Sequence, residues 1–381
     1  MRPVLWWSNG PNTPTGYGTQ TAQVVSRIAR DGGTVACLAN YGVEAEPLAW
    51  TSQFGDRVKV MPRGVEPFSR DVMLAYWQDF QRQHPDGMFI SLADIFVVSD
   101  DVTGSVDVRC WVPIEHAPLP ADVRHAFGRE GTQARPIAMS KYGHQQLTEN
   151  GIDAAYIPHG LEPTFRPTDG GGEVIGVPDD VYLVTMVAAN KGHQVIRKSF
   201  GEAFTAFQYL KKKRDDAFLY VHSDAKALGS VNLYALAESL GLQDRIIFAN
   251  EFKYRVGGYT QDDLAAIYTR SDIILAPSMG EGFGLTPLEA AACATPAVVS
   301  NFSAQPELAC EDSYLVEGQL WWHQGRQSFL FIPYVMSIAE ALLHAYDNPV
   351  YHSQSAVDLA RQYDADTVFD EYWVPYLASD R

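Results

Sequence analysis

Two glutamates, Glu281 and Glu289, lie eight residues apart beside a glycine-containing loop. Residues 273–276 form a short apolar run typical of a buried parallel strand, and glycines at 280, 282 and 284 follow it. A helix after such a loop directs free backbone N–H groups and the positive end of its dipole at phosphate or another anion. Because a bare carboxylate would repel phosphate, we expect both glutamates to face hydroxyl donors, such as those of a nucleotide sugar.

The helix that follows the loop offers a second explanation of Glu289. Thr286 is predicted as its N-cap and Pro287 as its first residue, and the sequence up to residue 295 has high helix propensity. Glu289 would then complete a capping box by accepting a hydrogen bond from the Thr286 N–H, and Glu281 would be a solvated loop acid. These residues alone leave both explanations open.

Residues 281–289, EGFGLTPLE, resemble the E-x7-E signature of retaining family 4 glycosyltransferases, which have the GT-B fold. The resemblance continues into residues 265–268 and 271–272 upstream, and into 296–298 and 305–307 downstream. It implies an α/β protein of two Rossmann-like domains that face each other across a cleft. It also implies transfer of a sugar, with retained configuration, from a nucleotide-diphosphate sugar such as UDP-glucose as co-substrate, with no separate cofactor.

Alternating strand-like and helical runs also predict doubly wound parallel sheets. The expected strands are 4–7, 34–39, 88–91, 108–113, 136–140, 181–187, 218–221 and 245–248. We expect an acceptor-side domain at 1–167 and a nucleotide-sugar domain at 168–355, joined by a glycine hinge at 168–172. The resemblance implies that a helical tail, 356–381, crosses back onto the first domain.

The opening residues repeat the pattern of strand, glycine loop and helix. Gly16 and Gly18 permit close approach of the backbone to a ligand, although an ordinary turn is the alternative. The resemblance implies that this loop faces the donor phosphates and the acceptor. His116 follows a predicted strand at the edge where open α/β sheets bind ligands. A lone histidine is more often structural, but the resemblance implies contact with the transferred sugar and a catalytic role beside Glu281.

Three cations, Lys191, Arg197 and Lys198, follow the first predicted strand of the second domain. They would oppose the charge of a diphosphate, unless they are merely solvated loop cations. The resembled family separates its arginine and lysine by several residues, so which cations contact phosphate stays open here. Backbone N–H groups of Phe283, Gly284 and Leu285 would complete the anion site. The D-x-D motif at 364–366 lies in the tail, so no metal bridge is expected.

Aromatic residues are the candidates for acceptor contacts. Tyr17, Trp321 and Trp322 offer flat faces for a base or a sugar, although core packing explains the two tryptophans equally well. The loop at 250–258 is expected to border the nucleotide base. It departs from the family pattern, so the base stays unassigned.

Composition restricts the class of protein. The chain has 381 residues and a net charge of −17, which disfavours non-specific binding to nucleic acid or anionic lipid. Four scattered cysteines, and no apolar run of roughly 18 residues, predict a reduced cytoplasmic protein without integral membrane association. A dinucleotide oxidoreductase is disfavoured because the first loop lacks the G-x-G-x-x-G fingerprint.

The acceptor is the least determined property. Residues 8–21, 113–120 and 190–192 resemble a phage-associated branch of family 4, some of whose members are thought to glucosylate hydroxymethylated DNA bases. The expectation is therefore 5-hydroxymethylcytosine in phage DNA, in the host cytoplasm. The alternatives are a small molecule, a lipid or a cell-envelope glycan as acceptor, or a catalytically inactive protein that binds sugar nucleotides.

Overall fold

The computed structural model describes residues 1–178, 180–192 and 195–379 and divides into two compact units. The first unit contains Met1–Gly160, Gln324–Ser328 and the tail from Tyr363 onward. The second contains Leu161–His323 and Phe329–Gln362. In the described residues, every helix is too short or too polar to cross a bilayer.

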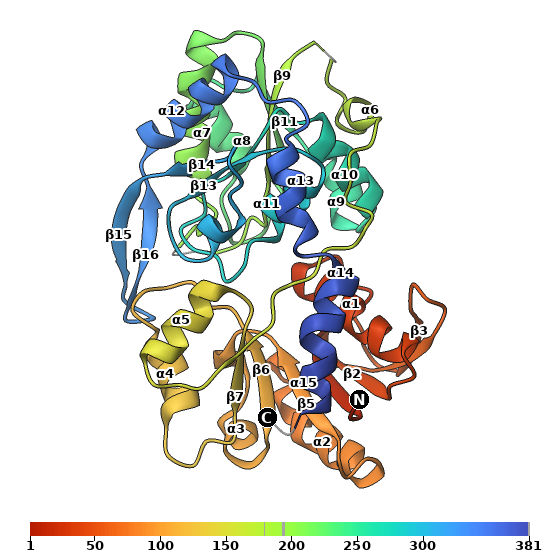
Figure 1. The fold of residues 1–381 in the computed structure, drawn as a ribbon. Coiled ribbons are helices and arrows are strands. Elements are labelled where there is room, and N and C mark those ends of the chain that lie inside the picture. Colours follow the sequence, from red (N-terminus) through yellow and green to blue (C-terminus); the bar gives the residue numbers. More distant parts are fainter. Residues whose placement is uncertain (179, 193–194, 380–381) are drawn as a thin grey trace. The chain divides into compact units, whose positions relative to one another are not determined.

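The described residues of the first unit form an eight-stranded sheet in the order β3-β4-β2-β1-β5-β6-β7-β8 (Figure 1). All its pairs are parallel except β3 with β4, an antiparallel edge that the sequence patterns did not predict. The strands are β1 Val4–Asn9, β2 Val35–Tyr41, β3 Leu48–Thr51, β4 Arg57–Met61, β5 Met88–Leu92, β6 Val108–Val112, β7 Arg135–Ala138 and β8 Ala155–Tyr156. The helices are α1 Gly16–Arg30, η1 Pro67–Ser69, α2 Arg70–Gln83, η2 Ile95–Val97, α3 Asp100–Ser105, α4 Ala121–Gly128 and α5 Lys141–Glu149.

The C-terminal tail packs on the first unit, where Figure 1 shows its dark blue helices beside the red and orange strands. It contains α14 Ala365–Val368, the π-helix η4 Phe369–Trp373 and α15 Val374–Ala378. Trp373 packs its ring against Trp6 and Trp111, with ring centroids 5.5 and 5.0 Å away. Asp366 accepts a hydrogen bond from Arg27 Nε at 3.0 Å and pairs with Arg30, while Asp364 caps α14. Both aspartates of the D-x-D motif therefore have structural partners.

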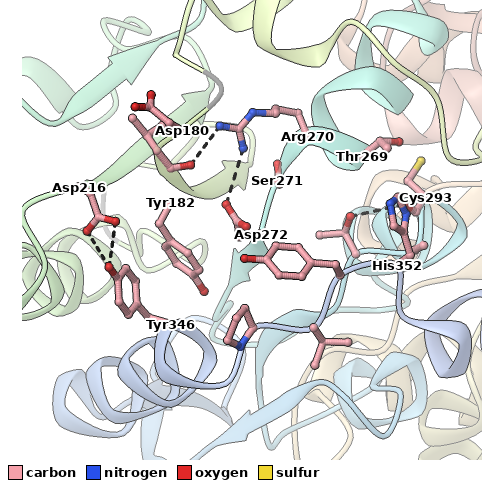
Figure 2. Close-up of a pocket in the computed structure, with 16 residues that line it drawn as sticks. Asp180, Tyr182, Asp216, Thr269, Arg270, Ser271, Asp272, Cys293, Tyr346 and His352 are labelled. Atoms are coloured by element: carbon pink, nitrogen blue, oxygen red, sulfur yellow. Dashed lines mark hydrogen bonds and ion pairs between the residues drawn. The ribbon is translucent and has the colours of Figure 1, made fainter.

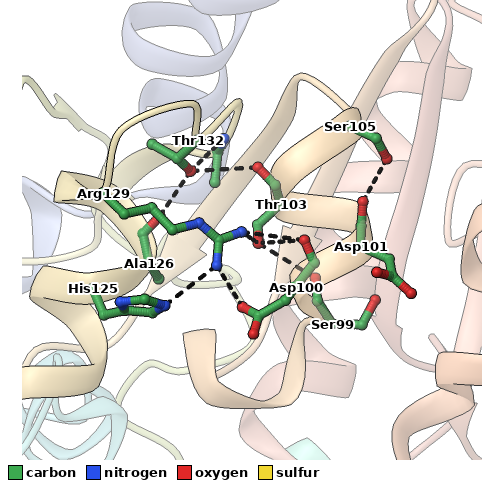
Figure 3. Close-up of polar contacts among 10 residues, drawn as sticks. Ser99, Asp100, Asp101, Thr103, Ser105, His125, Ala126, Arg129 and Thr132 are labelled. Carbon is green, nitrogen blue, oxygen red and sulfur yellow. Dashed lines mark hydrogen bonds and ion pairs between the residues drawn. The ribbon is translucent and has the colours of Figure 1, made fainter.

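Polar contacts tie α3 to α4 in the same unit (Figure 3). Arg129 donates to the Asp100 carboxylate at 2.7 Å and to Thr103 Oγ1 at 2.7 Å. Thr132 Oγ1 in turn donates to the carbonyl oxygen of Ala126 at 2.8 Å. These bonds hold the C-terminal end of α4 against α3.

The second unit is built on a six-stranded sheet, ordered β11-β10-β9-β12-β13-β14, whose described pairs are all parallel. Its strands are β9 Tyr182–Val187, β10 Ala217–His222, β11 Ile246–Phe248, β12 Ile273–Ala276, β13 Ala297–Ser300 and β14 Tyr314–Val316, with a separate hairpin of β15 Gly318–His323 and β16 Ser328–Pro333. Its helices are α6 Gly171–Ile175, α7 Phe200–Lys213, α8 Leu233–Ser239, α9 Glu251–Arg255, α10 Gln261–Arg270, α11 Leu285–Ala292, η3 Gln305–Leu308, α12 Val335–Asp347 and α13 Gln354–Arg361.

Two segments differ from the sequence-based expectation. The glycine run at 168–172 is not wholly a hinge, because α6 begins at Gly171 and Gly170 takes a left-handed conformation before it. A Cβ at Gly171 would lie 2.0 Å from the carbonyl oxygen of Ala266, so close packing on α10 requires glycine there. The predicted loop at 250–258 contains the short helix α9, which Asn250 caps by accepting from the Lys253 N–H.

Candidate active site

The loop between β12 and α11 places the start of α11 at the carboxyl edge of the second sheet. Gly284 is the N-cap, with φ of +116°, a conformation that L side chains rarely adopt. The prediction of Thr286 as N-cap was wrong: Thr286 lies in the first turn and its hydroxyl donates to the carbonyl oxygen of Val187 at 3.2 Å. Within the described residues no side chain caps α11, so the N–H groups at its start are suited to a ligand.

Glu281 is paired with two of the predicted cations. Arg197 Nη1 lies 2.9 Å from Glu281 Oε2, and Lys198 Nζ contacts the other carboxylate oxygen. The Glu281 side chain is only 13% exposed. Burial alone would raise the pKa of this carboxyl, but the charges of Arg197 and Lys198 lower it to about 2. The explanation of Glu281 as a solvated loop acid is therefore wrong.

The backbone on either side of Glu281 is also held in place. Arg197 donates to the carbonyl oxygen of Gly280, and the N–H of Glu281 donates to Ser303 Oγ at 2.9 Å. Arg197 also accepts, through its own carbonyl oxygen, the N–H of Met279 at 2.7 Å. The two loops that contain the cations and the first glutamate thus form one hydrogen-bonded cluster.

Glu289 is the fifth residue of α11 and has a neutral partner. Its Oε2 accepts a hydrogen bond from the hydroxyl of Tyr268 at 2.8 Å. Burial raises the pKa of Glu289 to about 7, against the opposing effect of the Tyr268 hydrogen bond. The capping-box explanation of Glu289 is contradicted, because Gly284 and not Thr286 is the N-cap and the Glu289 carboxylate is bonded to Tyr268.

A pocket of about 350 Å³ opens at the same sheet edge, beside the ends of β9 and β10. Lys191 lines it, together with Asn190, Asp224 and Tyr254. Asn190 is 3% exposed and is fixed by hydrogen bonds from its Nδ2 to the carbonyl oxygens of Asp224, at 2.9 Å, and Val231, at 2.7 Å. Residues 193 and 194 of the predicted cation loop lie outside the described residues.

The first unit contains the remaining predicted donor-side residues. Gly16 is the first residue of α1, and Thr15 caps this helix by accepting from the Gly18 N–H at 3.0 Å. A Cβ at Gly18 would lie 2.1 Å from Thr13 Oγ1 and 2.3 Å from the Thr13 carbonyl oxygen. The packing of the loop on itself therefore suffices to require glycine at this position.

His116 is also part of the first unit and is 7% exposed. It follows β6 and precedes a cis peptide between Ala117 and Pro118. The hydroxyl of Tyr142 donates to the His116 carbonyl oxygen at 2.8 Å, which fixes the backbone here. The structure thus holds His116 at the carboxyl edge of the first sheet, as its position after β6 predicted.

The predicted acceptor residues are divided between the units. Tyr17 is half-buried in α1 of the first unit. Trp321 and Trp322 lie in β15 of the second unit, where Trp321 stacks on His323 and the Trp322 ring is 4.9 Å from that of Phe329. Trp322 is 44% exposed, so core packing does not bury it completely.

Two residues of this site were not singled out from the sequence as functional. Tyr268, the partner of Glu289, lies on the buried face of α10, where the sequence pattern predicts only a core aromatic residue. Ser303 bonds the Glu281 backbone from a turn after β13, at a left-handed φ of +54°. No spacing rule connects either residue to the glutamates, because only the folded sheet brings them together.

The chain is similar to known glycosyltransferases in part of its sequence and in its fold. Residues 186–355 match the family Glycosyl transferases group 1. This group 1 segment contains the cluster of Arg197, Lys198 and Glu281, together with Glu289. The whole chain aligns with sucrose-phosphate synthase from Thermosynechococcus elongatus, with a TM-score of 0.74, 14% identity and 100% coverage of both chains. Anabaena HepE in complex with UDP-glucose gives a TM-score of 0.70 at 12% identity, covering 99% of this chain and 100% of that one. The fold is thus GT-B, with two Rossmann-like domains, as predicted.

Sequence relatives cover less of the chain. A D-inositol 3-phosphate glycosyltransferase of Mycobacterium sp. (strain KMS) is 36% identical over 75 residues, which is 20% of this chain and 16% of that protein. The corresponding enzyme of Streptomyces bingchenggensis is 25% identical over 254 residues, covering 58% of this chain and 54% of the relative. The chain therefore spans about half or less of these relatives' length.

Proposed function

We propose that this protein is a glycosyltransferase that moves a sugar from a nucleotide-diphosphate sugar to an acceptor hydroxyl. The observation that carries the proposal is the cluster of Glu281, Arg197 and Lys198 beside the start of α11, which no side chain of the described residues caps, inside the group 1 segment. This combination offers cations and N–H groups to a diphosphate and carboxylates to hydroxyls. An anion site alone would need neither of these partly buried glutamates.

Each residue has a distinct task in this proposal. The N–H groups at Phe283, Gly284 and Leu285, with Arg197 and Lys198, bind the diphosphate and stabilise its charge as it leaves. Glu289 accepts hydrogen bonds from donor hydroxyls, and Lys191 lines the neighbouring pocket. Glu281 accepts from hydroxyls of the transferred sugar, and His116 is assigned to the same sugar. The resemblance to family 4 supports both assignments.

Retention and metal independence belong to the same proposal. The bond between the anomeric carbon and the diphosphate breaks, and the acceptor oxygen bonds to that carbon on the same face. The acceptor proton passes to the departing phosphate oxygen. Because Arg197 and Lys198 supply the positive charge, transfer should continue in saturating EDTA. Loss of transfer that added Mg²⁺ restores would contradict this assignment.

For the acceptor, the narrower proposal is a hydroxymethylated base in DNA, supported by the resemblance of residues 8–21 and 113–120 to a phage-associated branch. Tyr17, Trp321 and Trp322 are then the stacking residues for the base. The compared proteins favour a small acceptor, since their names specify D-inositol 3-phosphate or a sugar phosphate synthase. The net charge of −17 also opposes DNA binding.

A two-stage experiment tests these proposals. Thermal unfolding is first followed with UDP-, GDP- and ADP-sugars, because a ligand that binds the folded state raises the melting temperature. The stabilising donor is then used in labelled form with DNA containing 5-hydroxymethylcytosine, with unmodified DNA, and with inositol phosphate and simple sugars. Transfer only to modified DNA supports the narrower proposal, and transfer only to a small acceptor overturns it.

The same assay separates an enzyme from an inactive binding protein. Donor binding with neither transfer nor hydrolysis would identify a sugar-nucleotide-binding protein and overturn the proposed activity. The variant Glu281→Gln should bind donor but transfer slowly. Glu311→Gln, which changes an exposed glutamate of the same unit, is the matched control.

A further inference from the structure

A second pocket of the second unit lies at the amino edge of its sheet, at the opposite ends of the strands from the glutamate cluster. It has a volume of about 560 Å³. Asp216, Asp272 and Thr295 lie just before β10, β12 and β13, and Tyr182 is the first residue of β9. Residues 349–352, which follow α12, line another side of the pocket. Within the second unit, this position separates the pocket from Glu281, Glu289 and the start of α11.

The charges that line the pocket favour a cation. Three aspartates and one arginine, Arg270, are among the lining residues, so the wall carries a net charge of −2 with His352 neutral. Arg270 is occupied by the protein itself, because it donates to the carbonyl oxygens of Pro178, at 2.9 Å, and Val181, at 3.0 Å. An anionic ligand would meet this net negative charge, which disfavours it.

Hydrogen-bond acceptors in the pocket remain available to a ligand. The Asp272 side chain is 13% exposed, and its Oδ2 accepts from the Leu183 N–H at 2.7 Å and lies 3.6 Å from Arg270 Nη1. Within the described residues both contacts involve Oδ2, so Oδ1 is available. Tyr182 is only 8% exposed, and its buried hydroxyl has no hydrogen-bond partner among the described residues. Figure 2 shows Tyr182 between Asp216 and Asp272, with its hydroxyl turned toward the middle of the group of lining side chains.

Aromatic faces complete the wall. The rings of Tyr182 and Tyr346 are 4.7 Å apart, and the Tyr346 hydroxyl donates to the Asp216 carboxylate at 2.8 Å. The guanidinium of Arg214 already lies 5.0 Å from the centre of the Tyr346 ring, so this ring takes a cation within the protein itself. Arg214 thus shows that this wall, with its tyrosine ring beside the Asp216 carboxylate, already accommodates one cation.

We propose that this pocket binds a small organic cation with primary ammonium groups, of the linear polyamine class. An ammonium group has three N–H donors and no acceptor, which matches the Asp272 oxygen and the Tyr182 hydroxyl. The volume is larger than one ammonium group needs, and the separate carboxylates of Asp216 and Asp272 suit a chain with a charge at each end. This proposal does not depend on the proposed transfer reaction, because binding of the cation can be measured directly.

The test is isothermal titration calorimetry of the full chain with spermidine at about 0.15 M salt, where weak surface attraction is screened. We expect saturable binding of one spermidine per chain. Asp272→Asn should weaken it at least tenfold, and Tyr182→Phe about fivefold. Asp153→Asn, which removes the same charge from an exposed position in the first unit, should leave it unchanged.

Tyr182→Phe distinguishes a ligand contact from a structural one. Because the buried hydroxyl has no hydrogen-bond partner among the residues that the structure describes, its removal should leave the melting temperature unchanged or raise it, while spermidine binding weakens. Equal weakening in Asp153→Asn, or absence of saturable binding, would overturn the proposal. So would tighter binding of tetramethylammonium or glucose than of spermidine, since neither has ammonium N–H donors.

Discussion

Each unit contains the same sequence pattern, a strand followed by a glycine loop and a helix, at its candidate ligand site. The two loops differ in chemistry. In the first unit, Thr15 caps α1 and the loop packs tightly around Gly18. In the second unit, α11 begins at a left-handed glycine with no side-chain cap among the described residues. There the loop holds Glu281 ionised between two cations.

This difference shows that a glycine loop is not by itself evidence of a ligand. Gly18 is explained by a Cβ clash with Thr13, whereas Gly284 is explained by its backbone conformation at an uncapped helix start. The second loop also carries Glu281, whose ionised form is stabilised by Arg197 and Lys198 from the loop after β9. The chemistry of the proposed reaction therefore depends more on the second loop than on the first.

The largest expected effect is on Glu281. Glu281→Gln removes the charge that Arg197 and Lys198 share, so both the geometry and the electrostatics of the donor site change. We expect the rate of sugar transfer at saturating donor to fall by about 10²- to 10³-fold, the size of effect seen when one preorganised polar group is lost. Initial rates measure it, with Glu311→Gln as control. Full activity of the variant, with an unchanged circular dichroism spectrum, would contradict the assignment.

Alanine at the two glycines should separate packing from ligand binding. Gly18→Ala should lower the free energy of unfolding by about 3 kcal/mol, because the new Cβ overlaps backbone and side-chain atoms of Thr13. Gly284→Ala should lower it by about 1 to 2 kcal/mol through backbone strain alone, since its nearest contact would be 3.3 Å, to Leu308 Cδ1. Urea denaturation measures both values. The affinity for the nucleotide sugar should fall in folded Gly284→Ala. If that affinity fell only in Gly18→Ala, the first loop and not the second would be the more important for donor binding.

The smallest effect is the pH dependence that Glu289 introduces. Its pKa of about 7 in the folded protein is above the value of about 4.3 in an unfolded chain, so the stability from the protonated form is lost as pH rises toward 7. If the ionised form accepts donor hydroxyls, donor affinity should increase about fivefold to tenfold between pH 6 and pH 8. Calorimetry at the two pH values measures this change, and Glu289→Gln should abolish it. An identical pH profile in wild type and variant would show that another group titrates.

Part of this picture could be predicted from local sequence. Apolar runs such as residues 273–276, the glycines at 280–284 and the spacing of Glu281 and Glu289 depend only on near neighbours in the chain. They were enough to predict the α/β class, the helix at 285–292 within a few residues, and the resemblance that the match over residues 186–355 supports. The exact helix start was predicted wrongly, because a left-handed glycine replaced the side-chain cap that Thr286 would have supplied.

The partners of the site were decided by tertiary structure. Arg197 and Lys198 are more than eighty residues from Glu281, and Tyr268 is 21 residues from Glu289. These pairs meet because β9 and β12 are neighbours in a parallel sheet and α10 packs beside α11. The sequence by itself determined which residue types could do the chemistry. The fold decided their protonation, since burial and a nearby charge act through space: the same side chain has a pKa of about 2 between two cations and about 7 beside a neutral tyrosine.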